Sequence, residues 1–205
     1  MNYLNSKKEI TRAERLHKQM QIYAKNIHSL WLDKDNSLWL GLFLKGALHY
    51  IPHLNRTVDY NLLSEEVSSG FCIIEDKNDH VWYGGPSGLF LIDKKKANAR
   101  PEKISPLRIF NLVQFNDSIL WAGTRKGSMF QINTRTLKVT SLPILPHTDL
   151  YVTYIYPDSH QRIWIGTDNN GLYVSDRNGS IIASYSKEQL GSNAIKGIIE
   201  DLSLI

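Results

Sequence analysis

Two groups of residues in this 205-residue chain have types and spacings that suit catalysis or metal binding. Ser87 lies in GGPSG, but a nucleophile elbow requires Gly-x-Ser-x-Gly at a turn from a strand into a helix, and this string falls between two predicted strands. His49 and His53 have the spacing that pairs metal ligands on a helix, but Pro52 and the surrounding strand pattern predict another geometry. We therefore expect no catalytic residue, no metal site and no cofactor.

A third group of residues suits the binding of hydroxylated or charged ligands. Four loops, each just after a Trp-x-Gly sequence, carry amide, carboxylate and basic side chains that can hydrogen-bond to sugars, and one carries a Phe that can stack on a pyranose ring. The alternative is that these residues serve only their turns. The candidate ligand-binding residues are Phe43, Lys45, Ser87, Arg125, Lys126, Asp168, Asn169 and Asn170.

The charge distribution argues against a nucleic-acid partner. The formal net charge of +4 comes from residues 1–26, and the remaining chain is neutral. The densest basic run, DKKKANARPEK at residues 93–103, has no interleaved aromatic residue on which bases could stack. We interpret it as a solvated linker.

A repeat of about 40 residues organises these loops. Four tryptophans, Trp39, Trp82, Trp121 and Trp164, lie 43, 39 and 43 residues apart. An acidic residue precedes three of them by six positions, at Asp33, Asp76 and Asp158, and Phe115 takes that position in the third unit. Glycines follow each Trp by two positions, at Gly41, Gly84, Gly123 and Gly166, and again near the loop end, at Gly46, Gly88, Gly127 and Gly171.

The sequence of each unit predicts a small antiparallel sheet. Short runs of alternating or continuous apolar residues, such as 27–32, 38–42 and 47–51, lie between Gly, Asn and Asp turns. The Asp should accept hydrogen bonds from turn amides, and the Trp should fill the space between sheets. Repeated sheets of this size predict an all-β fold, a β-propeller of four-stranded blades over residues 27–66, 67–107, 108–150 and 151–192, with the start of a fifth at 193–205.

These residues resemble the two-component regulator propeller repeat, most closely in YIYPDSHQRIWIGTDNNGLYVSD, and YSKEQLGSNAIKGIIED is similar to the family's link between blades. The resemblance covers residues 27–205. It implies a periplasmic sensor domain of a hybrid two-component receptor, common in Bacteroidetes, that detects oligosaccharides and passes the signal to a kinase absent from this chain. The resemblance therefore implies a non-enzymatic, carbohydrate-binding signalling module.

Four positions depart from the family pattern. The Gly usual three residues before each Trp is replaced by Asn36, Asp79, Ser118 and Gln161. Asn and Asp tolerate a left-handed conformation, whereas Ser and especially Gln do so less readily. A left-handed turn residue is therefore less favoured by residue type at Ser118 and Gln161 than at Asn36 and Asp79.

Four blades are fewer than the roughly seven that the resemblance implies, so the chain reads as a propeller fragment. Either it closes as a small ring, or it pairs with another copy or with further blades, or it is a truncated, non-functional product. Residues 1–26 read as a basic arm or the remnant of an upstream blade. The sequence lacks a secretion signal and any apolar run of the ~18–20 residues that span a membrane, so the chain as written is expected to be cytoplasmic and soluble.

Cys72 is the only cysteine and is expected in the core. Two other functions remain open at this point. One is a protein interaction scaffold, favoured by an unpaired sheet edge after Asp201. The more remote one is a polysaccharide lyase on a propeller scaffold, for which no acid and base pair is visible.

Overall fold

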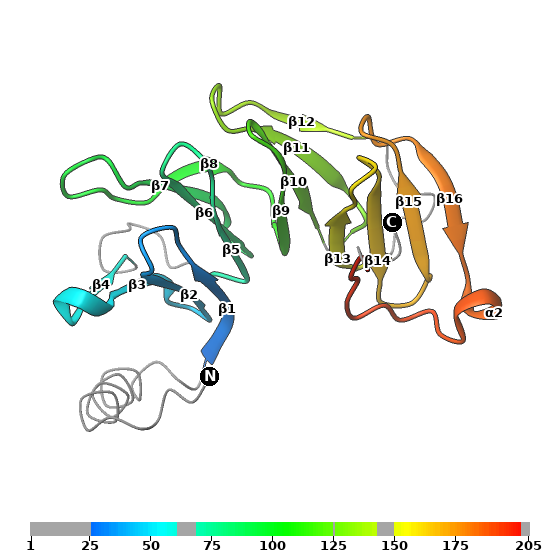
Figure 1. Ribbon diagram of the computed structural model, residues 1–205, viewed down its shortest axis with the longest axis horizontal. Helices are drawn as coiled ribbons and strands as arrows, with labels where there is room; N and C mark the ends of the chain where they lie inside the picture. Colours follow the sequence, from blue (N-terminus) through cyan, green and yellow to red (C-terminus); the bar gives the residue numbers. More distant parts are fainter. Residues whose placement is uncertain (1–25, 61–68, 125, 143–149, 202–205) are drawn as a thin grey trace.

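The computed structural model describes residues 26–60, 69–124, 126–142 and 150–201. These residues form four four-stranded antiparallel sheets, two short helices and the turns between them (Figure 1). The predicted arm at residues 1–26 lies outside the described residues, except for Asn26. Within the described part, no helix is long and apolar enough to cross a membrane.

Each sheet is formed by four strands that follow one another in the chain. The first sheet contains β1 (Ile27–Leu32), β2 (Leu38–Leu42), β3 (Gly46–Ile51) and β4 (Arg56–Asp59). The second contains β5 (Cys72–Glu75), β6 (His80–Gly85), β7 (Gly88–Asp93) and β8 (Glu102–Ser105). The third contains β9 (Asn111–Asn116), β10 (Ile119–Gly123), β11 (Met129–Asn133) and β12 (Val139–Ser141). The fourth contains β13 (Val152–Pro157), β14 (Ile163–Thr167), β15 (Leu172–Ser175) and β16 (Ile181–Tyr185), and α2 (Lys187–Leu190) follows it.

The four sheets are consecutive propeller blades, which confirms the predicted fold class. Their first strands contact one another in series, β1 with β5, β5 with β9 and β9 with β13, so these strands form the inner side of the assembly. Figure 1 shows the blades side by side in an arc that does not close into a ring. Residues 193–201, where the sequence predicts a fifth blade, contain no assigned strand.

Apolar side chains fill the spaces between neighbouring blades. Trp39 packs with side chains of the second blade, Trp82 with the third and Trp121 with the fourth, and all three are fully buried. Trp164 occupies the same position in the fourth blade but is only half-buried, since no further sheet packs on it among the described residues. The predicted role of the repeated Trp is confirmed for the three inner interfaces.

The repeated Asp ties the turn to the Trp within the first, second and fourth blades. Asp33 Oδ1 accepts hydrogen bonds from the amides of Asp35 and Ser37, and its Oδ2 accepts the indole Nε1–H of Trp39 at 3.0 Å. The second and fourth blades repeat this arrangement, with indole to carboxylate distances of 2.9 Å in both. One carboxylate therefore fixes the turn and the rotamer of the buried Trp together.

The third blade lacks this link because Phe115 occupies the Asp position. Trp121 Nε1 is buried without a hydrogen-bond partner, and the Phe115 ring lies 6.1 Å from the Trp121 ring instead. The turn is also tighter, because β10 begins three residues after β9 ends. Packing replaces hydrogen bonding at this corner.

The turn position three residues before the Trp is left-handed in three blades, including the one where Gln161, a residue type that adopts this conformation less readily, occupies it. Asn36, Asp79 and Gln161 have positive φ, at 56°, 69° and 61°. Gln161 is held there because Asp158 Oδ1 accepts hydrogen bonds from the amides on both sides of it, those of His160 and Arg162. Ser118, in the tight third turn, has no positive φ.

The Gly two residues after each Trp lies where the link to the next blade passes. At Gly41, a Cβ atom would overlap the carbonyl oxygen of Gly70 and the hydroxyl of Ser29. At Gly84 and Gly123, it would press on Ile109 and Val152, which begin the next blades. These glycines therefore set the spacing between blades.

We predict that Gly41→Ala lowers the free energy of unfolding by about 1–3 kcal/mol, because backbone atoms of Gly70 cannot move away from the added methyl group without separating two blades. Gly197→Ala is the control, since no heavy atom lies within 4 Å of the Cβ it would add. Urea unfolding of both variants measures the difference. Equal stability of the two variants would contradict the packing argument.

Candidate ligand-binding site

A cavity of about 1030 Å³ opens on the side of the blades where the loops after Trp-x-Gly meet the links between blades. Aromatic side chains dominate its wall. Phe43 comes from the loop between β2 and β3, and Phe71, Phe110 and Tyr151 each lie just before the first strand of the second, third and fourth blades. Phe130 of β11 also lines the cavity, so every blade contributes at least one aromatic residue to it.

The phenyl rings of this wall form a row. The rings of Phe43 and Phe71 are nearly parallel at 6.2 Å between centroids, and those of Phe71 and Phe110 are 5.1 Å apart. Backbone hydrogen bonds from Phe71 N–H to Gly84 and from Phe110 N–H to Gly123 fix two of these residues to their sheets. Phe43 and Tyr151 remain 41% and 46% exposed, so the cavity wall has accessible aromatic side chains in the first and the fourth blade.

Basic side chains supply the charge of this cavity. Arg108 and Lys126 line it and both are exposed, whereas none of the described residues that line it is acidic. Thr124 also lines the cavity, and its hydroxyl accepts the amide of Lys126 at 3.3 Å, which orders the start of that loop. The arrangement suits a ligand with flat apolar faces and anionic or hydroxyl substituents.

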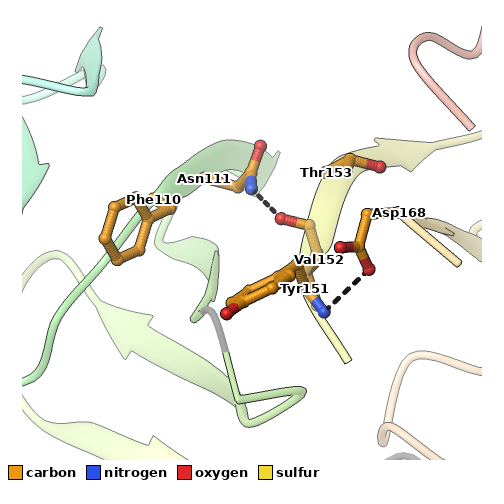
Figure 2. A pocket seen from close by; sticks show the side chains of 6 residues that line it. All are labelled: Phe110, Asn111, Tyr151, Val152, Thr153 and Asp168. Carbon is orange, nitrogen blue, oxygen red and sulfur yellow. Dashed lines mark hydrogen bonds between the residues drawn. The ribbon is translucent and has the colours of Figure 1, made fainter. Parts of the chain in front are cut away.

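A smaller hollow of about 440 Å³ shares Phe110 and Tyr151 with this cavity (Figure 2). Asp168 lines it, and its carboxylate accepts the backbone N–H of Tyr151 at 3.2 Å. Asn111 Nδ2 donates to the carbonyl of Val152 at 2.7 Å, which joins the third blade to the fourth. Asp168 and Asn111 thus hold the segment that carries Tyr151.

The structure does not bring the predicted site residues together in one cavity. Phe43 and Lys126 line the aromatic cavity, and Asp168 lines the hollow beside it. Asn169 and Asn170 line a separate hollow near β16, and Lys45 and Ser87 line none of these three cavities. Arg125 lies outside the described residues.

The candidate residues predicted from the sequence do not include Phe71, Phe110, Tyr151 and Arg108, which supply three of the aromatic side chains and one of the two basic side chains of the wall. The sequence does carry a signal for the aromatic residues, since one stands immediately before the first strand of three successive units. These residues lie in the links between blades, whereas the ligand contacts were predicted in the loops after Trp-x-Gly.

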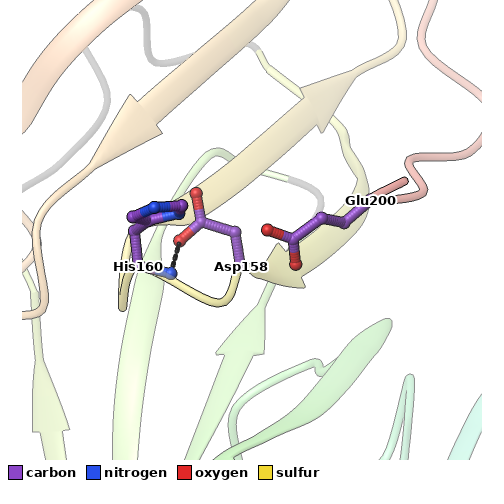
Figure 3. A group of neighbouring side chains, drawn as sticks. All are labelled: Asp158, His160 and Glu200. Atoms are coloured by element: carbon purple, nitrogen blue, oxygen red, sulfur yellow. Dashed lines mark hydrogen bonds between the residues drawn. The ribbon is translucent and has the colours of Figure 1, made fainter. Parts of the chain in front are cut away.

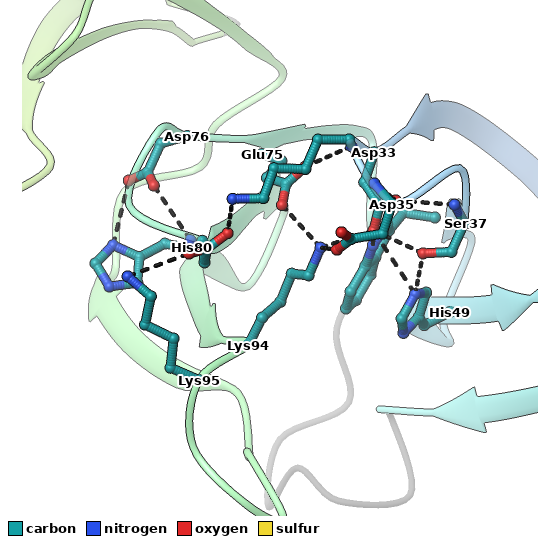
Figure 4. A network of polar contacts seen from close by, with 12 residues as sticks. Asp33, Asp35, Ser37, His49, Glu75, Asp76, His80, Lys94 and Lys95 are labelled. Carbon is teal, nitrogen blue, oxygen red and sulfur yellow. Dashed lines mark hydrogen bonds and ion pairs between the residues drawn. The ribbon is translucent and has the colours of Figure 1, made fainter.

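The opposite side of the blades carries a network of buried charges between the first and second blades (Figure 4). Lys94 Nζ lies 2.8 Å from carboxylate oxygens of Asp33, Asp35 and Glu75. The Asp33 and Glu75 side chains are 0% and 5% exposed, and that of Lys94 is 14% exposed. One lysine therefore neutralises carboxylates from two blades.

In this network, hydrogen bonding affects the pKa values of the charged groups more than burial does. Burial acts to raise the pKa of Asp33, but hydrogen bonds from Lys94, Ser37 and Trp39 hold it well below its usual range. Burial acts to lower the pKa of Lys94, but its carboxylate partners raise it above its usual range. Both groups therefore stay ionised in the folded protein at neutral pH.

A buried polar chain extends from Asp33 through Ser37 to His49. Ser37 Oγ donates to Asp33 Oδ2 at 2.6 Å and lies 2.5 Å from His49 Nε2, which requires a proton on Nε2 of a neutral imidazole. The imidazole stacks on Trp39 at 4.0 Å, and burial lowers the pKa of His49 to about 4. Since the carboxylate contacts the serine and Ser37 is buried, this chain stabilises the corner and differs from a nucleophilic triad.

Cys72 is buried, as predicted, and its thiol lies 3.8 Å from the carbonyl oxygen of Gly84. Burial raises the pKa of this thiol to about 12. The residue is therefore an unreactive part of the core.

Comparison with known proteins identifies the repeat. Residues 147–169 match the family model described as "Two component regulator propeller". The chain carries this propeller repeat. A histidine kinase P4 of Formosa agariphila is 27% identical over 177 residues, which cover 77% of this chain and 13% of that protein. The recognised resemblance is thereby confirmed, and the chain spans only a small part of that relative.

Solved structures share the fold of the propeller repeat described above. The extracellular domain of BT4673 from B. thetaiotaomicron, which its descriptions assign to a one-component or a hybrid two-component system, superimposes with a TM-score of 0.72 at 22% identity. The match covers 86% of this chain and 25% of that one. PorZ of Porphyromonas gingivalis, a surface component of the type-IX secretion system, gives a TM-score of 0.66 at 17% identity over 83% of this chain and 29% of that one.

We predict that Lys94→Met destabilises the protein by about 3–5 kcal/mol, because it leaves the buried carboxylates of Asp33 and Glu75 without a cation. Lys96→Met is the control, since that side chain is 67% exposed, and it should change stability by no more than about 0.5 kcal/mol. Chemical unfolding at neutral pH measures both. A cost for Lys94→Met as small as the control's would contradict the charge network.

We predict that acid weakens the fold through His49. The unfolded chain binds a proton on this imidazole below pH ~6.5, whereas the folded protein binds it only near pH 4, so stability falls as the pH drops through this range. His49→Gln should flatten the dependence of unfolding free energy on pH between about 6.5 and 4, and His53→Gln, at an exposed position, should not. An unchanged slope in His49→Gln would refute this assignment.

Proposed function

We propose that this chain is a non-enzymatic, ligand-binding part of a sensor propeller, and that its ligand is an oligosaccharide bound in the aromatic cavity. The single observation that carries the proposal is the aromatic wall of the cavity, to which every blade contributes, beside Arg108 and Lys126. Exposed aromatic faces suit sugar rings, and the basic side chains favour sugars with carboxylate or sulfate groups. The relatives support the signalling context, since one is a histidine kinase.

The cavity is suited to sensing because its wall is shared among four blades. A ligand that contacts Phe43 in the first blade and Tyr151 in the fourth favours one spacing of the blades over another. It shifts a signalling equilibrium only by the difference between its affinities for the two states. By analogy with extracellular neighbours of this fold, we place the domain in the periplasm.

Tyr151→Ala tests the aromatic contact. We expect it to weaken the binding of oligosaccharides that bind the unaltered protein by at least about tenfold, which corresponds to about 1.4 kcal/mol. Tyr154→Ala is the matched control, because Tyr154 is also exposed, at 37%, and does not line the cavity. Calorimetric titration with neutral and acidic oligosaccharides measures both variants.

Lys126→Met adds a test of ligand charge. It should weaken the binding of acidic oligosaccharides more than that of neutral ones, and the loss should shrink at high salt. Equal affinities in Tyr151→Ala, Tyr154→Ala and the unaltered protein would overturn this site. Failure of well-folded protein to bind any member of the panel would count against an oligosaccharide ligand.

A further inference from the structure

Two acidic clusters in this protein occupy equivalent places at the first and the fourth blade. Asp33 and Asp35 in the turn of the first blade correspond to Asp158 and His160 in the fourth, with the same 125-residue offset. Glu75, at the end of the second blade's first strand, corresponds with that offset to Glu200. In each cluster, the ligand atoms of the three residues lie within 4.8 Å of one another (Figures 3 and 4).

The backbone around the clusters is also equivalent. The amide of Lys34 donates to Glu75 at 3.2 Å, and the amide of Ser159, at the same turn position, donates to Glu200 at 2.9 Å. Residues 195–200 thus lie along the fourth blade as β5 lies along the first. Ile195 supports this placement, because its amide donates to Thr167 at 2.8 Å and its side chain covers Gly166, as Val152 covers Gly123.

The first cluster shows what such a cluster binds. Lys94, which follows the third strand of the second blade, places its amine 2.8 Å from each of three carboxylates. In the second cluster, Arg162 pairs with Asp158 at 2.6 Å but, among the described residues, not with Glu200. The position that Lys94 fills between the two blades therefore has no equivalent occupant there within the described chain.

An apolar face adjoins this second cluster. Trp164 lines a groove of about 460 Å³ together with Leu172, Ile195 and Ile199, and Ile199 is 90% exposed. Trp39, Trp82 and Trp121, which hold the same position in their blades, are all covered by a following sheet. The fourth blade thus presents one side of the interface that the protein forms three times between its other blades.

We propose that this face holds the rest of a further blade, whose first-strand position residues 195–200 occupy, and that a lysine or arginine following the third strand of that blade inserts between Asp158 and Glu200 as Lys94 inserts between Asp33 and Glu75. A second copy of this chain fits less well. Its first blade would bring Pro52 to the position of Lys94, and residues 195–200 already occupy the place of a first strand. The proposal is independent of what the aromatic cavity binds.

The test extends the chain from Asp201 with a second copy of residues 77–107, which continues the repeat and carries a second Lys94. We expect acrylamide quenching of Trp164 fluorescence, taken in each chain as the difference from its Trp164→Phe variant, to fall relative to the unextended chain. Lys94→Met in the added copy should lower Tm by at least about 2–4 °C, a shift measurable in a domain of this size. Lys96→Met in the added copy is the matched control.

A double-mutant cycle locates the contact. The Tm loss from Lys94→Met in the added copy should largely disappear when Glu200→Gln is already present. The same loss in both backgrounds, or an extension that leaves Trp164 as exposed as before, would overturn the proposal. Titration of the unextended protein with Zn²⁺ and Mn²⁺ provides a second route, because metal binding that His160→Gln abolishes would assign the cluster to a metal ion instead.

Discussion

The indole to carboxylate hydrogen bond between residues six positions apart organises most of this structure. A buried tryptophan needs a partner for its Nε1–H, and a carboxylate inside a turn needs several donors to stay ionised. The repeat meets both needs at once in three blades, because one Asp accepts the turn amides and the indole together. The Trp is then fixed in the rotamer that fills the space between sheets, and the direction of the next blade follows from it.

Two other constraints act at the same corner. Glycine two residues after the Trp lets the next link approach the sheet backbone, and Lys94 neutralises the carboxylates that two turns bring together. The third blade shows that the fold tolerates the loss of one element, since Phe115 packs on Trp121 where the Asp is absent. The loss leaves the buried indole N–H of Trp121 without a hydrogen-bond partner, and the packing around it must offset the free-energy cost of that unpaired donor.

The repeat, the four sheets and the buried tryptophans could be predicted from sequence because each depends on residues only a few positions apart. The aromatic residue before three of the first strands is also visible in the sequence, but the cavity is not, because Phe71, Phe110 and Tyr151 are about a blade apart in the chain and come together only when the blades pack. The left-handed conformation of Gln161, which its residue type does not favour, likewise depends on contacts beyond the residue itself. Its own preference is weaker than the hydrogen bonds that Asp158 makes to its neighbours.

The most direct test of this account is the amide-region NMR spectrum of the five tryptophan indole N–H groups. Nε1–H groups bonded to carboxylates should resonate downfield, so Trp39, Trp82 and Trp164 should separate from Trp31 and Trp121, whose indoles are buried without a partner. Asp76→Asn should move the signal of Trp82 and leave that of Trp121 in place. A spectrum in which Trp121 groups with Trp39 and Trp82 would contradict the claim that the carboxylate, rather than burial alone, fixes the repeated tryptophan.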